Sequence, residues 1–345
     1  MHFKADDMSV VFKTRSRLLD IDRAKGLAII LVVIGHVSDT GPIGNEWYDT
    51  LKHLLYSFHM AFFMFLSGYV MNISYRPLQS VNSFVKYISK RFERLMVPFL
   101  FFSLLIFVGK NVAQLLIVVN NPIGSPSDFL AVLLYPTDSI ARSLWYIYVL
   151  FIFSMSFPFL MMISRNRIEY WLALGIIFSL MNSFVSISHF VALHQICAYF
   201  VFLLTGAIAA KHQDLYLANI DKWGWAWVCL LGISLSLTYH YPSPPLLVTG
   251  MISIPALHAL IRKNPLARSN LLLTLGTFVF TIYLMNTIFL GSIRGLILHF
   301  VSLDYWHFLI IFPILIIAGL AGPVLLYRAV GHRARIFPIL LGGPR

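Results

Sequence analysis

Apolar residues occur along this chain in long runs, and polar or turn-forming residues separate one run from the next. Most runs approach the roughly 20 residues that an α-helix needs to cross the hydrocarbon core of a bilayer. Segments rich in Pro, Gly, Asn and charge stand between them, such as NNPIGSPSD at 120–128 and YPSPP at 241–245. The pattern predicts an all-α, polytopic bundle of transmembrane helices.

The runs predict ten spans, bounded to within a few residues: about 24–43, 53–73, 95–117, 143–163, 169–188, 191–210, 223–240, 246–261, 271–291 and 306–326. We therefore expect one transmembrane domain over 24–326, with polar tails at 1–23 and 327–345. No separate soluble domain and no internal repeat is visible. The first 22 residues lack an apolar stretch followed by a cleavage site, so no removable signal peptide is expected.

Composition supports a membrane protein. Hydrophobic residues make up 59% of the 345 and charged residues only 12%, whereas a soluble domain averages about 25% charged residues. These values exclude a secreted enzyme, a cytosolic globular domain and a disordered chain. Cys197 and Cys229 lie within apolar runs and are interpreted as packing residues. Ser67 and Gly68, in the second span, are expected to let helices pack closely.

The positive charges follow the predicted spans. The formal net charge is +12, and 26 residues are Lys or Arg. Most of them fall in the N-terminal tail, in every second loop between the spans and in the C-terminal tail. The exceptions are Lys52, Lys110, Arg142 and Arg294. Because cytoplasmic loops are enriched in positive residues, this alternation predicts that both termini are cytoplasmic. The basic balance therefore requires no nucleic-acid partner.

The first span has a polar end inside the membrane. GLAIILVVIG separates Lys25 from His36, and polar residues follow at 38–40. About a dozen apolar residues cannot cross a core ~30 Å thick, so His36 is expected within the bilayer. Eleven residues of α-helix rise ~16 Å and return to within ~20° of the same face, so Lys25 and His36 share one stripe. Asp39, three residues further on, is predicted to orient the imidazole.

This arrangement suits transfer of an acyl group across the membrane. A cytoplasmic cation would bind the anionic end of acyl-CoA, while His36 acts as general base on a hydroxyl from the other side. Arg91 and Arg94 in RFERLMVPF would share a helical face and bind phosphates. Alternatively, these cations only mark the cytoplasmic side and His36 is a solvated interface residue. Ionisable residues inside membranes are usually functional, which favours catalysis.

Several motifs together resemble the acyltransferase family 3 of bacterial inner-membrane proteins, and in particular its fucose O-acetylase-like members. They are LLDIDRAKGLAIILVVIGHV at 18–37, FHMAFFMFLSGYV at 58–70, the pair Arg91 and Arg94 with the following Pro98, SLWYIYVLFIF at 143–153 and LGTFVFTIYLMNTIF at 275–289.

The resemblance implies about ten transmembrane helices in the cell inner membrane. It also implies transfer of an acyl group, usually acetyl, from cytoplasmic acyl-CoA to a sugar hydroxyl of an extracytoplasmic glycan. His36 would be catalytic, and Lys25, Arg91 and Arg94 would bind the donor. Arg23, two residues before Lys25, is assigned to the same donor site.

One position departs from the family pattern. Many relatives have a histidine in the IYLxH stretch of the ninth span, where this chain has Asn286. Asparagine forms hydrogen bonds but carries no proton at neutral pH. We assign Asn286 to acceptor binding together with His59, Arg142 and Trp145. Arg142 would bind an anionic acceptor such as a polyprenyl phosphate or snorkel at the interface, and Trp145 would stack on a sugar or anchor in the aromatic belt.

Other function classes have weaker support. Neither HExxH nor CxxC occurs, so no metal is expected. GxSxG and GxxxxGK[ST] are also missing, which disfavours a serine hydrolase and a P-loop ATPase. No tightly bound cofactor is expected, since acyl-CoA is a co-substrate.

Two rival classes stay open. A secondary transporter or flippase for a glycolipid or a small anionic solute would use His36, Asp39 and Arg142 as a proton-coupled path, and a non-catalytic assembly scaffold would need none of them. We find no internal symmetry of the kind that transporters often show. For the enzyme, the sequence leaves open the sugar, the acyl chain, direct or relayed transfer, and the oligomeric state.

Overall fold

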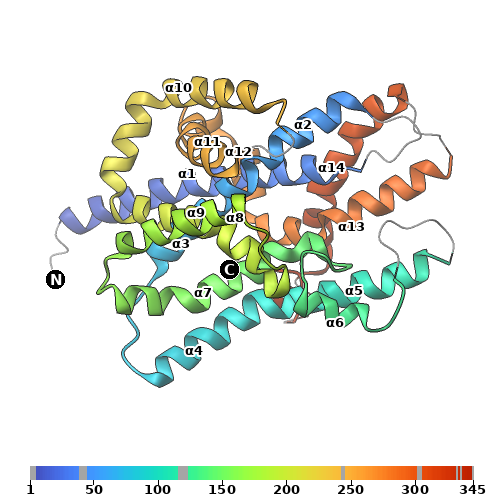
Figure 1. The fold of residues 1–345 in the computed structure, drawn as a ribbon, viewed down its shortest axis with the longest axis horizontal. Coiled ribbons are helices and arrows are strands. Elements are labelled where there is room, and N and C mark those ends of the chain that lie inside the picture. The colour runs from blue at the N-terminus through green and yellow to red at the C-terminus, as the bar shows by residue number, and fades with distance from the viewer. Residues whose placement is uncertain are drawn as a thin grey trace.

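The computed structural model of the chain describes residues 5–38, 45–115, 123–241, 245–300, 305–331, 333–334 and 336–343. Helices account for most of these residues, and no strand occurs among them. Several long helices, including α1, α5 and α7, run roughly along the long axis of the molecule (Figure 1). The predicted all-α fold is therefore confirmed.

The α-helices follow one another along the chain with short connections. They are α1 Ala5–His36, α2 Glu46–Tyr56, α3 His59–Ser74, α4 Val81–Arg91, α5 Val97–Ala113, α6 Asp128–Leu134, α7 Trp145–Ile163, α8 Leu172–Phe184, α9 Leu193–Lys211, α10 Gln213–Thr238, α11 Leu246–Ile261, α12 Asn270–Thr277, α13 Val279–Leu298, α14 Tyr305–Val330 and α15 Phe337–Leu340. A π-helical segment, η1 Phe92–Met96, joins α4 to α5, and short 3₁₀ segments include η2 Arg142–Leu144 before α7 and η3 Ile168–Trp171 before α8.

Six helical segments in the described part of the chain are long and apolar enough to cross a membrane. They are Glu46–Ser74, Val81–Ala113, Arg142–Ile163, Phe190–Lys211, Val279–Leu298 and Trp306–Val330. Two shorter apolar segments are Ile168–Phe184 and Leu246–Ile261. Each of the ten segments expected from the sequence overlaps a helix. The number that cross the bilayer and the side on which the termini lie stay predictions.

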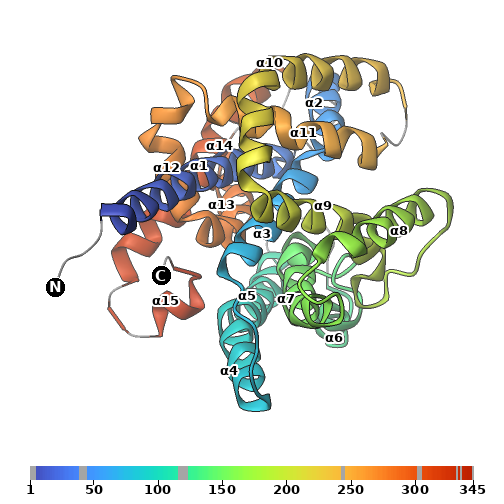
Figure 2. The ribbon, with the colours of Figure 1, turned by 90° about the vertical axis from the view of Figure 1, so that its left-hand side faces the viewer.

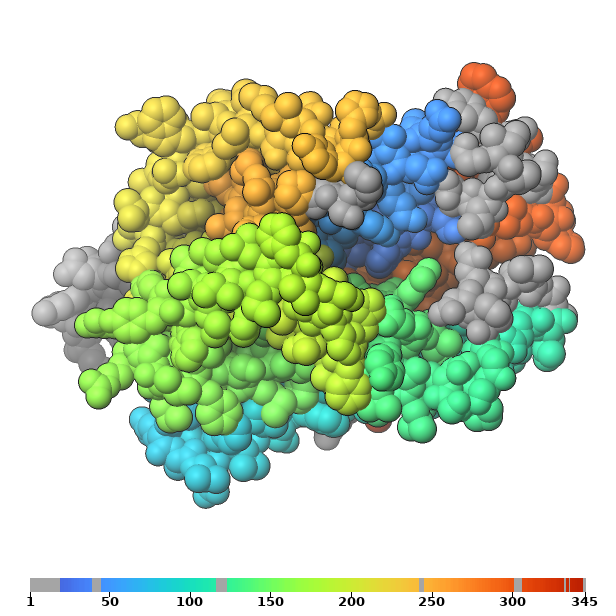
Figure 3. Space-filling model, viewed as in Figure 1, coloured from blue at the N-terminus to red at the C-terminus, as the bar shows by residue number. Residues whose placement is uncertain are grey.

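Helix α1 lies at the centre of the bundle. It packs against α12, α13, α3, α11 and α14, and a view from the end of the molecule shows these helices around it (Figure 2). The space-filling view shows α10 and α11 on one side of the molecule and α4 on the opposite side (Figure 3). Because α1 is continuous from Ala5 to His36, Lys25 and His36 are ~16 Å apart along one helix, as the spacing predicted.

Glycine lets α1 and α3 approach their neighbours at backbone distance. A Cβ atom at Gly26 of α1 would collide with the carbonyl oxygen of Leu272 on α12. One at Gly68 of α3 would collide with the carbonyl oxygen of Leu203 on α9. Small residues allow this kind of close helix packing in membranes. The packing role predicted for Gly68 is therefore confirmed, and these contacts fix the position of α1 and α3 in the bundle.

Replacing Gly206 with alanine is expected to destabilise the protein. Gly206 faces α3 from α9, and a Cβ there would collide with the carbonyl oxygen of Phe65. Overpacking of this kind costs about 1–3 kcal/mol, so thermal unfolding in detergent should shift to lower temperature. Gly232→Ala on α10 is the matched control, because nothing lies within 4 Å of its Cβ position. Equal stability of the two variants would contradict close packing of α3 on α9.

The second predicted span is broken into two helices, α2 and α3, at Ser57. A break exposes backbone carbonyls that need new donors. The hydroxyl of Thr249 on α11 donates to the carbonyl of Ser57 at 2.8 Å. Nδ1 of His59 donates to the carbonyl of Leu55 at 2.6 Å. These side chains stabilise the change of direction between α2 and α3.

An ion-pair network joins α1 to α10 and to the end of α11. Arg262, which follows α11, bonds Asp221 on α10 at 2.8 and 2.7 Å and also bonds Asp20 on α1. The hydrogen bond from Arg262 lowers the pKa of Asp221 below its usual value. The network thus ties the first part of α1 to two neighbouring helices.

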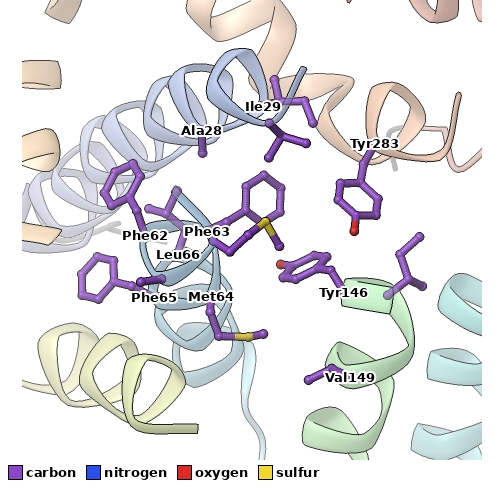
Figure 4. Packing of buried hydrophobic residues seen from close by; sticks show 14 of the residues in the cluster. Ala28, Ile29, Phe62, Phe63, Met64, Phe65, Leu66, Tyr146, Val149 and Tyr283 are labelled. Atoms are coloured by element: carbon purple, nitrogen blue, oxygen red, sulfur yellow. The ribbon is translucent and has the colours of Figure 1, made fainter. Parts of the chain in front are cut away.

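Buried aromatic residues hold α3, α7 and α13 together (Figure 4). The rings of Phe63 and Tyr146 are 4.8 Å apart edge to face, and those of Tyr146 and Tyr283 are 5.3 Å apart. The hydroxyl of Tyr146 also forms a hydrogen bond with that of Ser67. Since Tyr283 is one turn before Asn286 on α13, this cluster positions that part of α13 beside α7 and α3.

Candidate active site

His36 is the last residue of α1, and its imidazole contacts α13. Its Nδ1 lies 2.8 Å from Oδ1 of Asn286. The amide nitrogen of Asn286 donates to the carbonyls of Ile282 and Tyr283 at 3.0 and 2.8 Å. Because both amide hydrogens point to carbonyls of α13, the amide oxygen faces His36 and accepts from Nδ1. In neutral His36 the proton is then on Nδ1, and Nε2 is the basic nitrogen.

Asp39, which was predicted to orient His36, lies outside the described residues. Asn286 is the orienting partner that the described part of the chain contains, and its side chain is fully buried. The sequence placed Asn286 with the acceptor. That assignment stays a prediction, and the structure shows the Asn286 amide hydrogen-bonded to His36, 250 positions away in the chain.

Two tyrosines of α2 hold the end of α1. The hydroxyl of Tyr48 donates to the carbonyls of Ile34 and Val37 at 2.8 and 2.6 Å, and that of Tyr56 donates to Gly35 at 2.7 Å. The last carbonyls of a helix have no partner within it, so α2 satisfies the carbonyls around the catalytic candidate. Sequence reasoning missed both tyrosines, because nothing in the local pattern shows that their partners belong to another helix.

His59 lies next to this end of α1. It is buried, its ring stacks on Tyr56 with 5.2 Å between ring centroids, and its charge would act on His36. Its Nδ1 donates to the Leu55 carbonyl. The predicted contact of His59 with the acceptor stays a prediction.

Lys52 approaches the same place from α2. Its ammonium group is 5.9 Å from the ring centroid of Tyr48 and 5.8 Å from that of Tyr56. Cations are attracted to aromatic faces at such distances. Lys52 is therefore held over the two rings whose hydroxyls bond the end of α1, and its charge acts on His36.

Arg142 reaches the site from the start of α7. It is solvent-exposed and opens the short segment η2. The next residue, Ser143, has its hydroxyl oxygen 3.4 Å from that of Thr287, which is adjacent to Asn286 on α13. The charge of Arg142 acts on His36 as well. Trp145 follows one turn later and lies 5.1 Å from Tyr199 between ring centroids.

The residues assigned to the donor lie elsewhere. On α1, Lys25 bonds Asp22 at 2.9 Å, and Nε of Arg23 donates to the carbonyl of Ser269 at 3.4 Å. Arg91 ends α4, and its guanidinium lies 5.2 Å from the ring centroid of Tyr87. Helices α1 and α4 occupy separate parts of the bundle in both views (Figures 1 and 2). A donor bound by both groups of cations would have to extend between them.

Arg94 lies in the π-helical segment η1, so its spacing from Arg91 differs from the regular α-helical turn assumed from the sequence. Pro98 explains the local structure. It has no N–H to donate to the carbonyl of Arg94 four residues earlier, and its ring would clash with that carbonyl in an α-helix. The chain widens instead, and the N–H of Val97 bonds the carbonyl of Phe92. Such π turns occur frequently at functional sites.

A family model described as an acyltransferase domain matches residues 18–328 of this chain. The chain belongs to acyltransferase family 3. The match includes every candidate site residue, and it makes the protein an acyltransferase. The resemblance carried by the sequence motifs is thereby confirmed.

Two curated relatives of this acyltransferase are both described as Nodulation protein NolL. The protein from Mesorhizobium japonicum is 30% identical over 163 residues, which are 46% of this chain and 39% of that protein. The protein from Sinorhizobium fredii is 33% identical over 101 residues, which are 28% of this chain and 26% of that protein. The matches thus span well under half of the relatives' own length. No solved structure matches this chain.

The acyltransferase fold brings one group of the predicted site residues together and leaves another apart. Four of them lie together at one end of α1: His36 of α1, His59 of α3, Asn286 of α13 and Arg142 of η2. The cations predicted to bind the donor are distributed over α1, α4 and η1. The structure therefore describes the candidate base and its surroundings more completely than the donor site.

Proposed function

We propose that this acyltransferase is a membrane-embedded O-acyltransferase of the cell inner membrane. It transfers an acyl group, with acetyl as the group assigned, from cytoplasmic acyl-CoA to a sugar hydroxyl. The acceptor is a cell-surface polysaccharide or a lipid-linked oligosaccharide. The hydrogen bond between His36 and Asn286 carries this proposal, because it leaves Nε2 of a neutral imidazole available as a base.

The proposed reaction needs no group beyond the two substrates and this base. Nε2 of His36 takes the proton from the sugar hydroxyl as the hydroxyl oxygen attacks the carbonyl carbon of the thioester. The tetrahedral intermediate collapses, the carbon–sulfur bond breaks, and the thiolate of CoA leaves with the bonding electrons. The protonated imidazole then gives its proton to the thiolate, so the products are the sugar ester and CoA.

Asn286 contributes by stabilising one tautomer and one orientation of the imidazole. Its oxygen accepts a hydrogen bond from Nδ1–H of His36 throughout the reaction, including the step in which both ring nitrogens are protonated. The tyrosine hydroxyls on α2 fix the backbone that carries the ring. This orientation is a requirement of general base catalysis, since the base must lie within hydrogen-bond distance of the hydroxyl that it deprotonates.

On the donor side, the proposal assigns the phosphates of acyl-CoA to Arg91 and Arg94, with Lys25 and Arg23 near the path of the acyl arm. Guanidinium groups suit phosphates because they donate paired hydrogen bonds in one plane. Lys25 already has a carboxylate partner in Asp22, so its charge is less available than that of an unpaired lysine. We assign the larger share of donor binding to the arginines because of their paired, planar donors.

The sidedness of the reaction provides the test. We expect inside-out membrane vesicles that contain this protein to transfer label from radiolabelled acetyl-CoA to endogenous glycan, because their cytoplasmic face is outside. Sealed right-side-out vesicles should transfer no label until they are made permeable to CoA. Vesicles without the protein are the control. Label transfer in sealed right-side-out vesicles, or transfer independent of the protein, would contradict the proposal, and preference for succinyl-CoA would correct the acyl group.

A further inference from the structure

Two of the rare cations outside the predicted cytoplasmic segments lie near His36. Only Lys52, Lys110, Arg142 and Arg294 among the 26 Lys and Arg residues lie outside those segments. Lys52 belongs to α2 and Arg142 to η2, which are far apart in the chain. The positive charges of both act on His36.

Lys52 is held in this position by the same residues that fix the end of α1. Tyr48 and Tyr56 flank it by one helical turn on either side, and its ammonium group lies within 6 Å of both ring centroids. Both hydroxyls bond carbonyls next to His36. Lys52 therefore cannot move away from the catalytic candidate without leaving both aromatic contacts.

Arg142 is placed by a contact on the opposite side of the site. The neighbouring Ser143 meets Thr287 on α13, directly after the asparagine that orients His36. The guanidinium of Arg142 and the ammonium group of Lys52 thus approach the imidazole from two elements of the bundle.

Asp138, four residues before Arg142, bonds His189 at 2.8 Å and so has another partner. Lys52 and Arg142 carry like charges, which repel one another. A bound anion would remove this cost, and Arg142 could bind it with two parallel hydrogen bonds.

We propose that Lys52 and Arg142 bind an anionic group of the acceptor, a phosphate or a carboxylate, beside the hydroxyl that His36 deprotonates. The inference rests on the proposed function, which it deepens by assigning the acceptor to a chemical class. A phosphate would come from a lipid-linked sugar, and a carboxylate from an acidic sugar of the glycan. In either case the anion positions the acceptor, while the imidazole performs the proton transfer.

The test measures binding to the purified full chain without any acyl transfer. The probes are farnesyl diphosphate, dodecyl glucuronide and the neutral farnesol, with binding followed by tryptophan fluorescence. We expect Arg142→Gln and Lys52→Gln to weaken binding of the anionic probes by roughly tenfold or more, the loss typical of a hydrogen bond to a charged group. Arg142→Lys keeps the charge but not the paired hydrogen bonds, so it should lose less affinity than Arg142→Gln and more than the exposed controls. The probe that binds more tightly identifies the anion as phosphate or carboxylate.

Matched variants separate this site from other causes. Arg76→Gln and Lys222→Gln remove one positive charge from exposed positions and should leave probe binding unchanged. Arg91→Gln and Arg94→Gln should weaken binding of CoA but not of farnesyl diphosphate, whereas Arg142→Gln should do the reverse. Unchanged binding in Arg142→Gln and Lys52→Gln, equal losses in the exposed controls, or equal binding of farnesol would overturn the proposal.

The same experiment distinguishes this proposal from the proposed function. If the anionic probes bind as expected but the vesicles transfer no acyl group, the anion site stands and the O-acyltransferase assignment fails. The vesicles could instead transfer acetyl groups, with the Arg142→Gln protein using anionic and neutral acceptors in the same ratio as the wild type. The O-acyltransferase then stands and the anion site fails.

Discussion

Replacing His36 with glutamine is expected to lower kcat for acyl transfer by a factor of about 10²–10⁴, the usual contribution of a positioned general base. Glutamine has a similar size and can still hydrogen-bond to Asn286, so the local packing should change little. It cannot take a proton from a sugar hydroxyl. The measurement is the initial rate of label transfer from acetyl-CoA to glycan in inside-out vesicles, normalised to the amount of folded protein.

Two further measurements make the result for His36 specific. The affinity for CoA should be unchanged, because the donor is assigned to residues on α4 and η1. His299→Gln removes an imidazole from an exposed position after α13 and should keep the wild-type rate. A His36→Gln protein that is folded and fully active would show that the base is another residue.

Replacing Asn286 with leucine is expected to lower kcat by about 10–100-fold, the loss seen when the hydrogen-bond partner of a functional histidine is removed at a metal site. Leucine fills a similar volume but leaves Nδ1 of His36 without an acceptor. The imidazole can then rotate or place its proton on Nε2, and only part of the molecules present a base to the acceptor. Steady-state kinetics should show a lower kcat with little change in the KM for acetyl-CoA.

Rescue by a residue of the right chemistry distinguishes orientation from packing. Asn286→His should recover most of the activity, because a ring nitrogen can accept a hydrogen bond from His36. In the family pattern, many relatives have a histidine at this position. Asn219→Leu is the matched control, since the oxygen of Asn219 accepts from the ring nitrogen of Trp227 at 3.0 Å on an exposed face of α10. Equal activity of Asn286→Leu and wild type would exclude a positioning role.

The proposed donor side and the proposed acceptor side of the site differ in how they are built. On the proposed acceptor side, a hydrogen bond to α13 fixes His36, and Lys52 lies over aromatic rings of its own helix. On the proposed donor side, Arg94 lies in a π turn and is solvent-exposed. A long flexible donor can adapt to exposed arginines, whereas deprotonation of a hydroxyl requires a base held in place.

Much of the fold could be read from the sequence because its determinants are local. Long apolar runs predicted helices, and each of the ten predicted segments overlaps one. The first span was predicted to reach about residue 43, whereas α1 ends at His36. Pro98 could have indicated the π turn, but we assumed a regular α-helix because Arg91 and Arg94 are three residues apart.

The partners of the site residues could not be read in this way. His36 and Asn286 are separated by 250 positions, and the meeting of Lys52 with the end of α1 depends on the break between α2 and α3. Asparagine in an apolar helix has many possible partners, and its own sequence neighbours do not select one.

The sequence by itself determined that this chain is a helical membrane protein of the acyltransferase type, with a histidine in its first long apolar segment. Only the tertiary structure decided that Asn286 orients that histidine and that cations from α2 and η2 lie beside it. The physical reason is that hydropathy and helical spacing act within about 20 residues, whereas the direction of a side-chain hydrogen bond depends on how helices pack. Here that packing is set by glycine contacts such as those of Gly26 and Gly68.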